Sequence, residues 1–219
     1  MARPSNKDER REQIAEALLA VMARQGYEGA SVAAVARQAR VAVGLAHYHF
    51  RDKREILLLA LERLGQRQEA RVTARVEAAG DDPRAQLDAW LEAHLGVASA
   101  APVDLACWVM AGGEALRDPE VRRVHASVVV ASVDGLTRIV RRGIAAGVFQ
   151  ATKPEARAIA VALGALVQGY FTVASVAPEL PPAGSALKAA RAMAGGLLGM
   201  ERETAAARPR ARAKKEGRR

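Results

Sequence analysis

Residues Ser31–Glu55 constrain the fold of this chain more than any other stretch of the sequence. They read SVAAVARQARVAVGLAHYHFRDKRE, with two short apolar-periodic segments separated by a break at Arg40–Ala42, followed by an aromatic and basic cluster that opens a further helix. Ser31 is a good N-cap for the first segment, and Asp52 with Glu55 resembles a capping box. This spacing is the layout of a helix-turn-helix, in which the second short helix lies in the major groove of DNA.

The composition favours an all-α protein. Half of the residues are hydrophobic and only 4% are aromatic, and the strong helix formers Ala, Leu, Arg and Glu are abundant. The single Cys107 excludes an internal disulfide framework and is typical of a reducing compartment. No apolar run is expected to approach the roughly 20 residues that span a bilayer, and the N-terminal residues lack the apolar segment of a secretory signal. A cytoplasmic protein without a membrane partner is therefore expected.

Positive charge is concentrated at the two ends of the chain. Residues 1–54 contain 10 Lys and Arg against 6 Asp and Glu, and residues 202–219 contain 8 against 2. The intervening residues are close to neutral, with 15 basic and 16 acidic side chains. Basic ends around a neutral body suit a polyanionic partner, although the charge of the tail is equally consistent with solvated residues that have no partner.

Apolar periodicity divides the chain into three parts. A helix-turn-helix domain is expected over residues 1–54, a larger helical domain over 55–200, and a basic, disordered tail over 201–219. The first helix is expected to begin after Ser5 or Asn6 and to end at Gly26. The expected helices of the second domain span 84–99, 103–116, 119–146, 153–177 and 185–199. Thr152 and Pro154 are the predicted N-cap and first-turn proline of the fourth of these.

The second short helix has a predicted inner face and a predicted outer face. Val41, Ala46 and Phe50 are expected to pack inward. The outward positions are expected to be Val43, Leu45, His47, Tyr48 and His49. Apolar residues on this face can contact thymine methyl groups, while the polar ones, together with Lys53 and the helix start at Ser31, can donate to phosphates. The alternative for Tyr48 and His49 is packing between neighbouring helices.

These elements resemble the DNA-binding domain of the tetracycline-repressor (TetR) family of transcriptional regulators. The resemblance lies in the polar cap Ser31, the short helix that follows it, the segment Gly44–Phe50 with its Tyr-His-Phe ending, and Asp52 with Lys53. It implies DNA contacts at Val43, Gly44, Leu45, His47, Tyr48, His49 and Lys53. Two positions depart from the family pattern. Arg40 stands where the family usually has Gly, and Ala42 stands where it favours a Ser or Thr cap; each departure costs about 1 kcal/mol if the backbone is as in the family.

The same resemblance implies that the second domain binds a small ligand and forms a homodimer. In the family the last two long helices make the dimer contact, which here are the expected helices over 153–177 and 185–199. The residues expected to form this contact are Ile159, Leu163, Leu166, Val167, Tyr170 and Phe171. The alternative is that all of them belong to the core of one subunit.

Candidate ligand-binding residues are the polar, aromatic and sulfur-containing side chains of the apolar helices. They are Trp90, His94, Cys107, Trp108, Met110, Glu114, His125 and Tyr170. Such residues more often belong to a core than to a binding site. The run Ala106–Met110 ahead of Asp118–Arg122 faintly resembles the choline- and betaine-responsive subgroup of the family, in which Trp and Tyr rings would hold a quaternary ammonium by cation–π attraction.

The sequence predicts a homodimeric repressor that binds a palindromic double-stranded DNA operator and is released by a small-molecule effector. The alternatives are a ligand-independent or activating regulator, and a helical enzyme. No catalytic residue or cofactor is expected, because Cys107 has no paired base and the chain has no phosphate loop or nucleophile motif. No metal site is expected either, since His47 and His49 are two residues apart on a helix and point about 200° apart.

Overall fold

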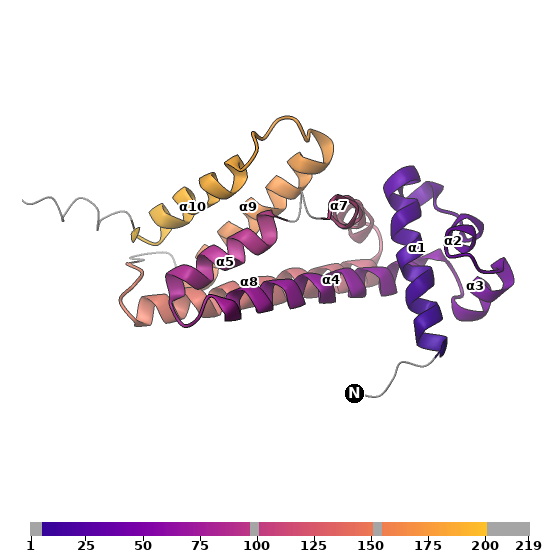
Figure 1. Ribbon diagram of the computed structural model, residues 1–219, viewed down its shortest axis with the longest axis horizontal. Coiled ribbons are helices and arrows are strands. Elements are labelled where there is room, and N and C mark those ends of the chain that lie inside the picture. The colour runs from indigo at the N-terminus through magenta and orange to yellow at the C-terminus, as the bar shows by residue number, and fades with distance from the viewer. Residues whose placement is uncertain (1–5, 97–100, 151–154, 201–219) are drawn as a thin grey trace, which may run out of the picture.

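The computed structural model describes residues 6–96, 101–150 and 155–200, and within these ranges every regular element is a helix (Figure 1). The predicted all-α class is therefore confirmed. The elements are α1 (Asn6–Gly29), α2 (Val32–Gln38), α3 (Val43–His49), α4 (Lys53–Ala78), α5 (Pro83–Leu95), α7 (Pro102–Ala115), α8 (Pro119–Ala145), α9 (Ala156–Val176) and α10 (Ser185–Leu197).

Helices α1, α2 and α3 gather at one end of the molecule, around the start of α4 (Figure 1). Their shared core contains Ile14, Leu18 and Met22 from α1, each fully buried, together with Val35 and Ala46. The spacing of the α1 residues places them on one helical face, as the periodicity predicts. The core continues into α4 through Ile56, Leu57 and Leu61, so the N-terminal helices are seated on a long helix that leads into the rest of the protein.

The first helical stretch ends at Gly26, as predicted. Gly26 adopts the left-handed φ of 70°, and a further helical stretch follows to Gly29 after the kink. The prediction that Gly26 terminates a helix is therefore confirmed, and α1 consists of two helical stretches joined at this kink. The ammonium of Lys53 explains why the extra turn persists, because its Nζ donates to the backbone oxygens of Tyr27, at 2.7 Å, and Glu28, at 3.4 Å.

The larger part of the molecule is built on α4 and α8, which lie lengthwise beside each other (Figure 1). Helix α5 packs on both of them, α9 packs on α8, and α10 packs on α5 and α9. Its core contains Leu87, Trp90, Leu136, Ile159 and Leu163. Asp82 and Asp118 cap α5 and α8 by accepting hydrogen bonds from backbone N–H groups, and a proline follows each cap. These local signals placed the starts of both helices close to their predicted positions.

Several predictions concern residues outside the described ranges. The cap at Ser5, the cap and proline at Thr152 and Pro154, and the tail over 201–219 all lie there. The helix predicted over 84–99 ends at Leu95, and residues 97–100 also lie outside the described ranges. The domain limits of 54 and 200 remain predictions; α4 runs across the first of them without a break.

The expectation that no apolar run approaches the length of a bilayer span is wrong. Helix α9 has 21 residues, and an 18-residue stretch of it has a mean hydropathy of 1.8, so the helix is long and apolar enough to cross a membrane by length and composition alone. Only 28% of this apolar stretch is buried. Ile159, Leu163, Val167 and Phe171 recur every fourth residue and pack into the core, so the helix belongs to the bundle on that side and leaves an apolar face uncovered on the other.

Candidate nucleic-acid interface and internal cavity

The turn between α2 and α3 has a left-handed residue at the position where the TetR family usually has Gly. Arg40 has φ of 55° and is the one non-glycine residue of the described ranges with a positive φ. The chain reverses there, and the N–H of Val41 donates to the oxygen of Ala36 at 3.0 Å. From outside the motif, Gln13 Nε2 donates to the oxygen of Ala39 at 2.7 Å, which fastens the turn to α1. The two short helices are therefore held at a fixed angle.

Helix α3 presents most of the predicted outward residues to solvent. Tyr48 is 76% exposed, Val43 41% and Leu45 37%, and Gly44 and His47 are exposed as well. On the opposite side Ala46 and Phe50 are buried and Val41 packs against the core, as predicted. The result is a short helix with a rigid inner face and a free outer face of small, apolar and aromatic residues, which is what major-groove docking requires.

His49 is an exception, because the prediction that it faces outward is wrong. Its side chain is only 8% exposed, and its Nδ1 is buried without a hydrogen-bond partner in the described part of the chain. Burial, with the nearby cation of Arg11, lowers the pKa of His49 below its usual value. The geometry of a helix gives the reason, since residues two apart point to opposite sides and His47 already occupies the outer one.

Lys53 is also engaged within the molecule. Besides its bonds to the end of α1, its Nζ lies 4.2 Å from the centre of the Tyr27 ring. The structure thus gives Lys53 the role of a clamp between α1 and α4, and a phosphate contact from this residue remains only a prediction. Ser31, in contrast, is exposed and caps α2 through its hydroxyl, which accepts from the N–H of Ala34 at 3.1 Å.

The structure adds basic residues that the sequence reasoning missed. Arg37, Arg40 and Arg51 are exposed and flank α3 on either side along the chain. These residues occupy the positions that the apolar pattern leaves exposed to solvent. The same pattern could therefore have identified them from the sequence. Guanidinium groups in these places can meet the phosphates on the two sides of a groove.

The missing cap of α3 gives a stability prediction. Ala42 occupies the N-cap position with extended φ and ψ of −64° and 143° and no side-chain hydrogen bond. We expect Ala42→Ser to raise the free energy of unfolding by about 1 kcal/mol, because the serine hydroxyl can accept a hydrogen bond from a backbone N–H in the first turn of α3. Urea unfolding followed by circular dichroism measures this change. Ser31→Ala removes the existing cap of α2 and is the opposite control, so its free energy of unfolding should fall by a similar amount. A higher free energy of unfolding in both variants would contradict the capping argument.

An internal cavity lies between the helices of the larger part. It has a volume of about 80 Å³ and is lined from α4, α5, α7, α8 and α9. A wider groove of about 880 Å³ between α4 and α8 adjoins the cavity, and the two share Gly65, Gln68, Trp90, His94, Val128 and Ser132. The apolar wall of the cavity includes Leu64, Leu105, Val128, Val133, Val167 and Phe171.

Three of the predicted ligand-binding residues line this cavity, namely Trp90, His94 and Trp108. Met110, Glu114, His125 and Tyr170 line neither the cavity nor the groove. Cys107 does not line them either; its thiol donates to the oxygen of Leu19 at 3.2 Å, and burial raises its pKa to about 12. The positions that the sequence reasoning missed are polar residues on α4 and α9, above all Gln68, Arg71 and Gln168.

His94 is a neutral member of the cavity wall. Its Nδ1 lies 2.8 Å from the oxygen of Trp90, which can only accept, so Nδ1 carries the proton. Nε2 is then an acceptor, and the Ser132 hydroxyl, 3.0 Å away, donates to it. Burial lowers the pKa of His94 to about 4, and the positive charge of Arg71 acts in the same direction against the hydrogen bond to Trp90. The ring therefore carries no charge near neutral pH.

This pKa gives a prediction for stability against pH. The folded pKa of about 4 lies below the unfolded value of 6.5, so the unfolded chain binds the proton more tightly between these values. We expect the free energy of unfolding to fall by about 3 kcal/mol from this residue as the pH drops from about 6.5 to 4. The lowered pKa values of His49 and His125 act with the same sign. Denaturant unfolding across this pH range should show that the free energy of unfolding depends less steeply on pH in His94→Gln than in the unaltered protein. If the two proteins have the same pH dependence, the pKa of His94 is not lowered by folding.

Comparison with known proteins bears on both regions. Residues 14–60 match the family model of bacterial regulatory proteins of the tetR family, and residues 83–199 match the model of the C-terminal domain of BetI-type transcriptional repressors. The chain belongs to the TetR family. As a TetR-family regulator it is a DNA-binding protein of transcription and not an enzyme.

Individual relatives of this TetR-family regulator extend over most of its length. It is 29% identical to the HTH-type transcriptional regulator BetI of Burkholderia mallei over 183 residues, which cover 83% of this chain and 89% of the relative. A crystal structure of a transcriptional regulator from Rhodococcus sp. Rha1 has a TM-score of 0.76 at 27% identity and covers 87% of this chain and 96% of that one. A regulator from Saccharomonospora viridis in complex with choline has a TM-score of 0.75 at 23% identity, covering 89% and 97%.

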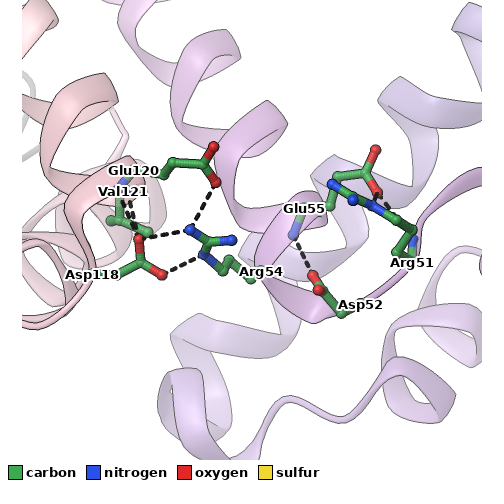
Figure 2. A network of polar contacts seen from close by, with 7 residues as sticks. All are labelled: Arg51, Asp52, Arg54, Glu55, Asp118, Glu120 and Val121. Atoms are coloured by element: carbon green, nitrogen blue, oxygen red, sulfur yellow. Dashed lines mark hydrogen bonds and ion pairs between the residues drawn. The ribbon is translucent and has the colours of Figure 1, made fainter.

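A polar network joins the two parts of the TetR-family regulator. Arg54, in the first turn of α4, pairs with Asp118 and Glu120 at the start of α8, with Nη2 3.2 Å from Asp118 Oδ1 and 2.7 Å from Glu120 Oε2 (Figure 2). Asp118 Oδ1 also accepts from the N–H of Val121. The hydrogen bond from Arg54 holds the pKa of Asp118 below its usual value.

The opposite side of the same α4 turn faces the DNA-binding helices. Asp52 Oδ1 accepts from the N–H of Glu55 at 2.8 Å, and Glu55 Oε2 accepts from the N–H of Arg51 at 3.0 Å (Figure 2). The predicted capping box is therefore present, with the return bond reaching the residue before the cap. One turn of helix is thus hydrogen-bonded to Arg51, which follows α3, and is paired with the start of α8.

The predicted dimer residues lie mostly inside one subunit. Ile159, Leu163, Val167 and Phe171 are at most 7% exposed and pack into the core of the bundle, so the prediction that they form the dimer contact is wrong. Leu166 and Tyr170 are partly exposed. The reason is that one side of α9 packs into the subunit's own bundle, while most residues on its outward side are small.

Proposed function

We propose that this regulator is a homodimeric repressor that binds a palindromic operator in the bacterial cytoplasm and is released by a small molecule bound in the α4–α9 cavity. The observation that carries the DNA part is the exposed outer face of α3, where Val43, Leu45 and Tyr48 stand free on a helix whose inner face is locked. A single seven-residue helix reads few base pairs, and a second copy related by two-fold symmetry doubles the contact.

The uncovered face of α9 and α10 supports the dimer. Apart from Arg157, which pairs with Asp134, the exposed residues of α9 are small or apolar and share one side of the helix: Ala158, Val161, Ala162, Ala165, Gly169, Thr172 and Val176. On α10 Met193, at 52% exposure, and Leu197, at 38%, extend the patch. Small residues let the backbones of two helices approach closely, and an exposed apolar face of this length is unfavourable in water. A second copy of the same face would cover it.

The cavity borders two helices whose first turns are linked near the DNA-binding end. Its walls include α4 and α8, and the Arg54 network ties the first turn of α4 to the first turn of α8. A molecule that widens the space between these helices would shift α4 and, with it, the spacing of the two α3 helices in a dimer. The effector weakens operator binding only to the extent that it binds the state with widely spaced α3 helices more tightly than the state that binds the operator.

The test is binding to the DNA that flanks the regulator's own gene, by footprinting and then by titration of the protected duplex. We expect a palindromic footprint, and we expect Tyr48→Ala to weaken the complex by about tenfold or more. Leu180→Ala is the matched control, because Leu180 is also strongly exposed, at 69%, but lies between α9 and α10. Equal losses in the two variants, or no protected site, would contradict the proposal.

A ligand-independent or activating regulator is the second candidate. Its distinguishing feature would be the basic tail, which supplies affinity for any DNA. Removing residues 202–219 separates the two candidates. If the truncated protein loses all DNA binding while Tyr48→Ala does not, the contact is the tail and not α3.

A further inference from the structure

Three buried hydrogen-bond donors on the cavity wall have no acceptor. They are Nε1 of Trp90, Nε2 of Gln68 and Nε of Arg71, each of which is buried without a partner in the described part of the chain. All three residues line the cavity. A buried donor left unpaired costs free energy on the order of 1–3 kcal/mol, so a folded protein rarely keeps several on one wall unless something supplies an acceptor.

The charged side chains of the cavity wall carry a net positive charge, which also favours a hydrogen-bond acceptor. The charged residues that line the cavity are Arg67, Arg71 and Asp104. Arg67 pairs with Asp104 at 3.3 Å and with Glu16. Arg71 has only the amide oxygen of Gln68 as a partner and meets no carboxylate in the described ranges. Because His94 is neutral, Arg71 leaves the wall with one positive charge in excess.

The aromatic residues do not form an open cage for a cation. One face of Trp90 lies against the His94 ring, with the centroids 4.0 Å apart, and one face of Trp108 is stacked on His125 at 3.8 Å. Tyr170 does not line the cavity. A quaternary ammonium prefers several free ring faces and a nearby negative charge, whereas this wall offers donors and a surplus guanidinium.

We propose that the effector of this cavity is a carboxylate carried on an apolar body. The carboxylate accepts hydrogen bonds from Arg71, Gln68 and Trp90, and the apolar body lies between Val128 and Phe171. This rests on the proposed function, since it names the chemical class of molecule that would act at the same site. It also separates this regulator from the choline complex of its Saccharomonospora relative.

Three probes of equal chain length test the head group, namely octanoate, octan-1-ol and octyltrimethylammonium. The chain has two tryptophans, Trp90 and Trp108, and both line the cavity, so intrinsic fluorescence reports binding directly. We expect octanoate to bind the full-length protein at least about tenfold more tightly than either of the other probes. We also expect Trp90→Phe, which keeps an aromatic ring and removes the N–H, to weaken octanoate binding and to leave octan-1-ol binding unchanged.

Substitutions on α4 locate the contact. Arg71→Met should weaken octanoate binding by about tenfold or more, while Arg71→Lys, which keeps the charge, should retain part of the affinity for octanoate. Arg75→Met is the matched control one turn further along α4, because Arg75 is exposed and pairs with Glu92 across the surface. It should bind octanoate as the unaltered protein does.

The inference fails if octan-1-ol binds as tightly as octanoate, if octyltrimethylammonium or choline binds more tightly, or if none of the probes changes the fluorescence. It also fails if Arg75→Met loses as much octanoate affinity as Arg71→Met. These outcomes are distinct from failure of the proposed function, which is read from operator binding without any probe. If choline alone released the operator, the proposed repressor function would stand and the proposal of a carboxylate effector would be wrong.

Discussion

Ala165→Glu is expected to convert the protein into a monomer and to weaken operator binding by about a hundredfold or more. Ala165 lies in the middle of the exposed face of α9, four residues from Val161 and four from Gly169. In the proposed dimer two copies of this face meet, so the variant would bury two glutamates without partners, at a cost of several kcal/mol. Without the dimer, each α3 binds its half-site alone.

Size-exclusion chromatography with light scattering measures the mass, and fluorescence anisotropy of the labelled operator measures the affinity. Ala70→Glu is the control, because it places the same charge on an exposed position of α4 that lines neither the cavity nor the groove. It should remain a dimer and bind DNA normally. A dimeric Ala165→Glu protein would show that the subunits meet elsewhere.

The DNA-binding end could be predicted from sequence because its signals are local. The Ser31 and Asp52 caps each depend on a few adjacent residues, and the structure shows both. The positions of Arg40 and Ala42 drew attention only through the resemblance to the TetR family, and the structure shows a left-handed backbone at Arg40 and no side-chain cap at Ala42. His49 was misplaced although the same helical geometry that separated it from His47 already implied that one of the pair faces inward.

The larger part was less predictable because its sites depend on contacts between distant residues. On α9 the large side chains were expected to face a second subunit, yet residues such as Leu163 fill the subunit's own core, and the outward face is built from small residues such as Ala162. In the cavity, aromatic residues were expected from α5 and α7. The polar residues Gln68 and Arg71 come from α4, where the sequence pattern shows only an ordinary polar helix face.

Gly143→Ala is expected to destabilise the protein by about 3 kcal/mol, the largest loss expected from a single methyl group in the described part of the chain. A Cβ added at Gly143 would lie 2.1 Å from Cδ2 and 2.2 Å from Cε2 of Phe149, whose ring is 3% exposed. The ring has no room to retreat, because the N–H groups of Val148 and Phe149 both donate to the Gly143 oxygen, at 2.9 and 3.0 Å. Either the ring leaves the core or the turn after α8 opens, and overpacking of this kind costs roughly 1–3 kcal/mol before any apolar burial is lost.

Gly135→Ala is the matched control two turns earlier on the same helix. The nearest atom that its Cβ would meet is Nη2 of Arg138, at 3.8 Å, the end of a flexible side chain. Because alanine is the better helix former, this variant should gain about 0.5–1 kcal/mol. Urea unfolding of both proteins at one concentration compares them, since the stability of a dimer depends on concentration. Identical methyl additions should then move the midpoint in opposite directions, and a loss of similar size in both would mean that α8 tolerates no added side chain, whatever its neighbours.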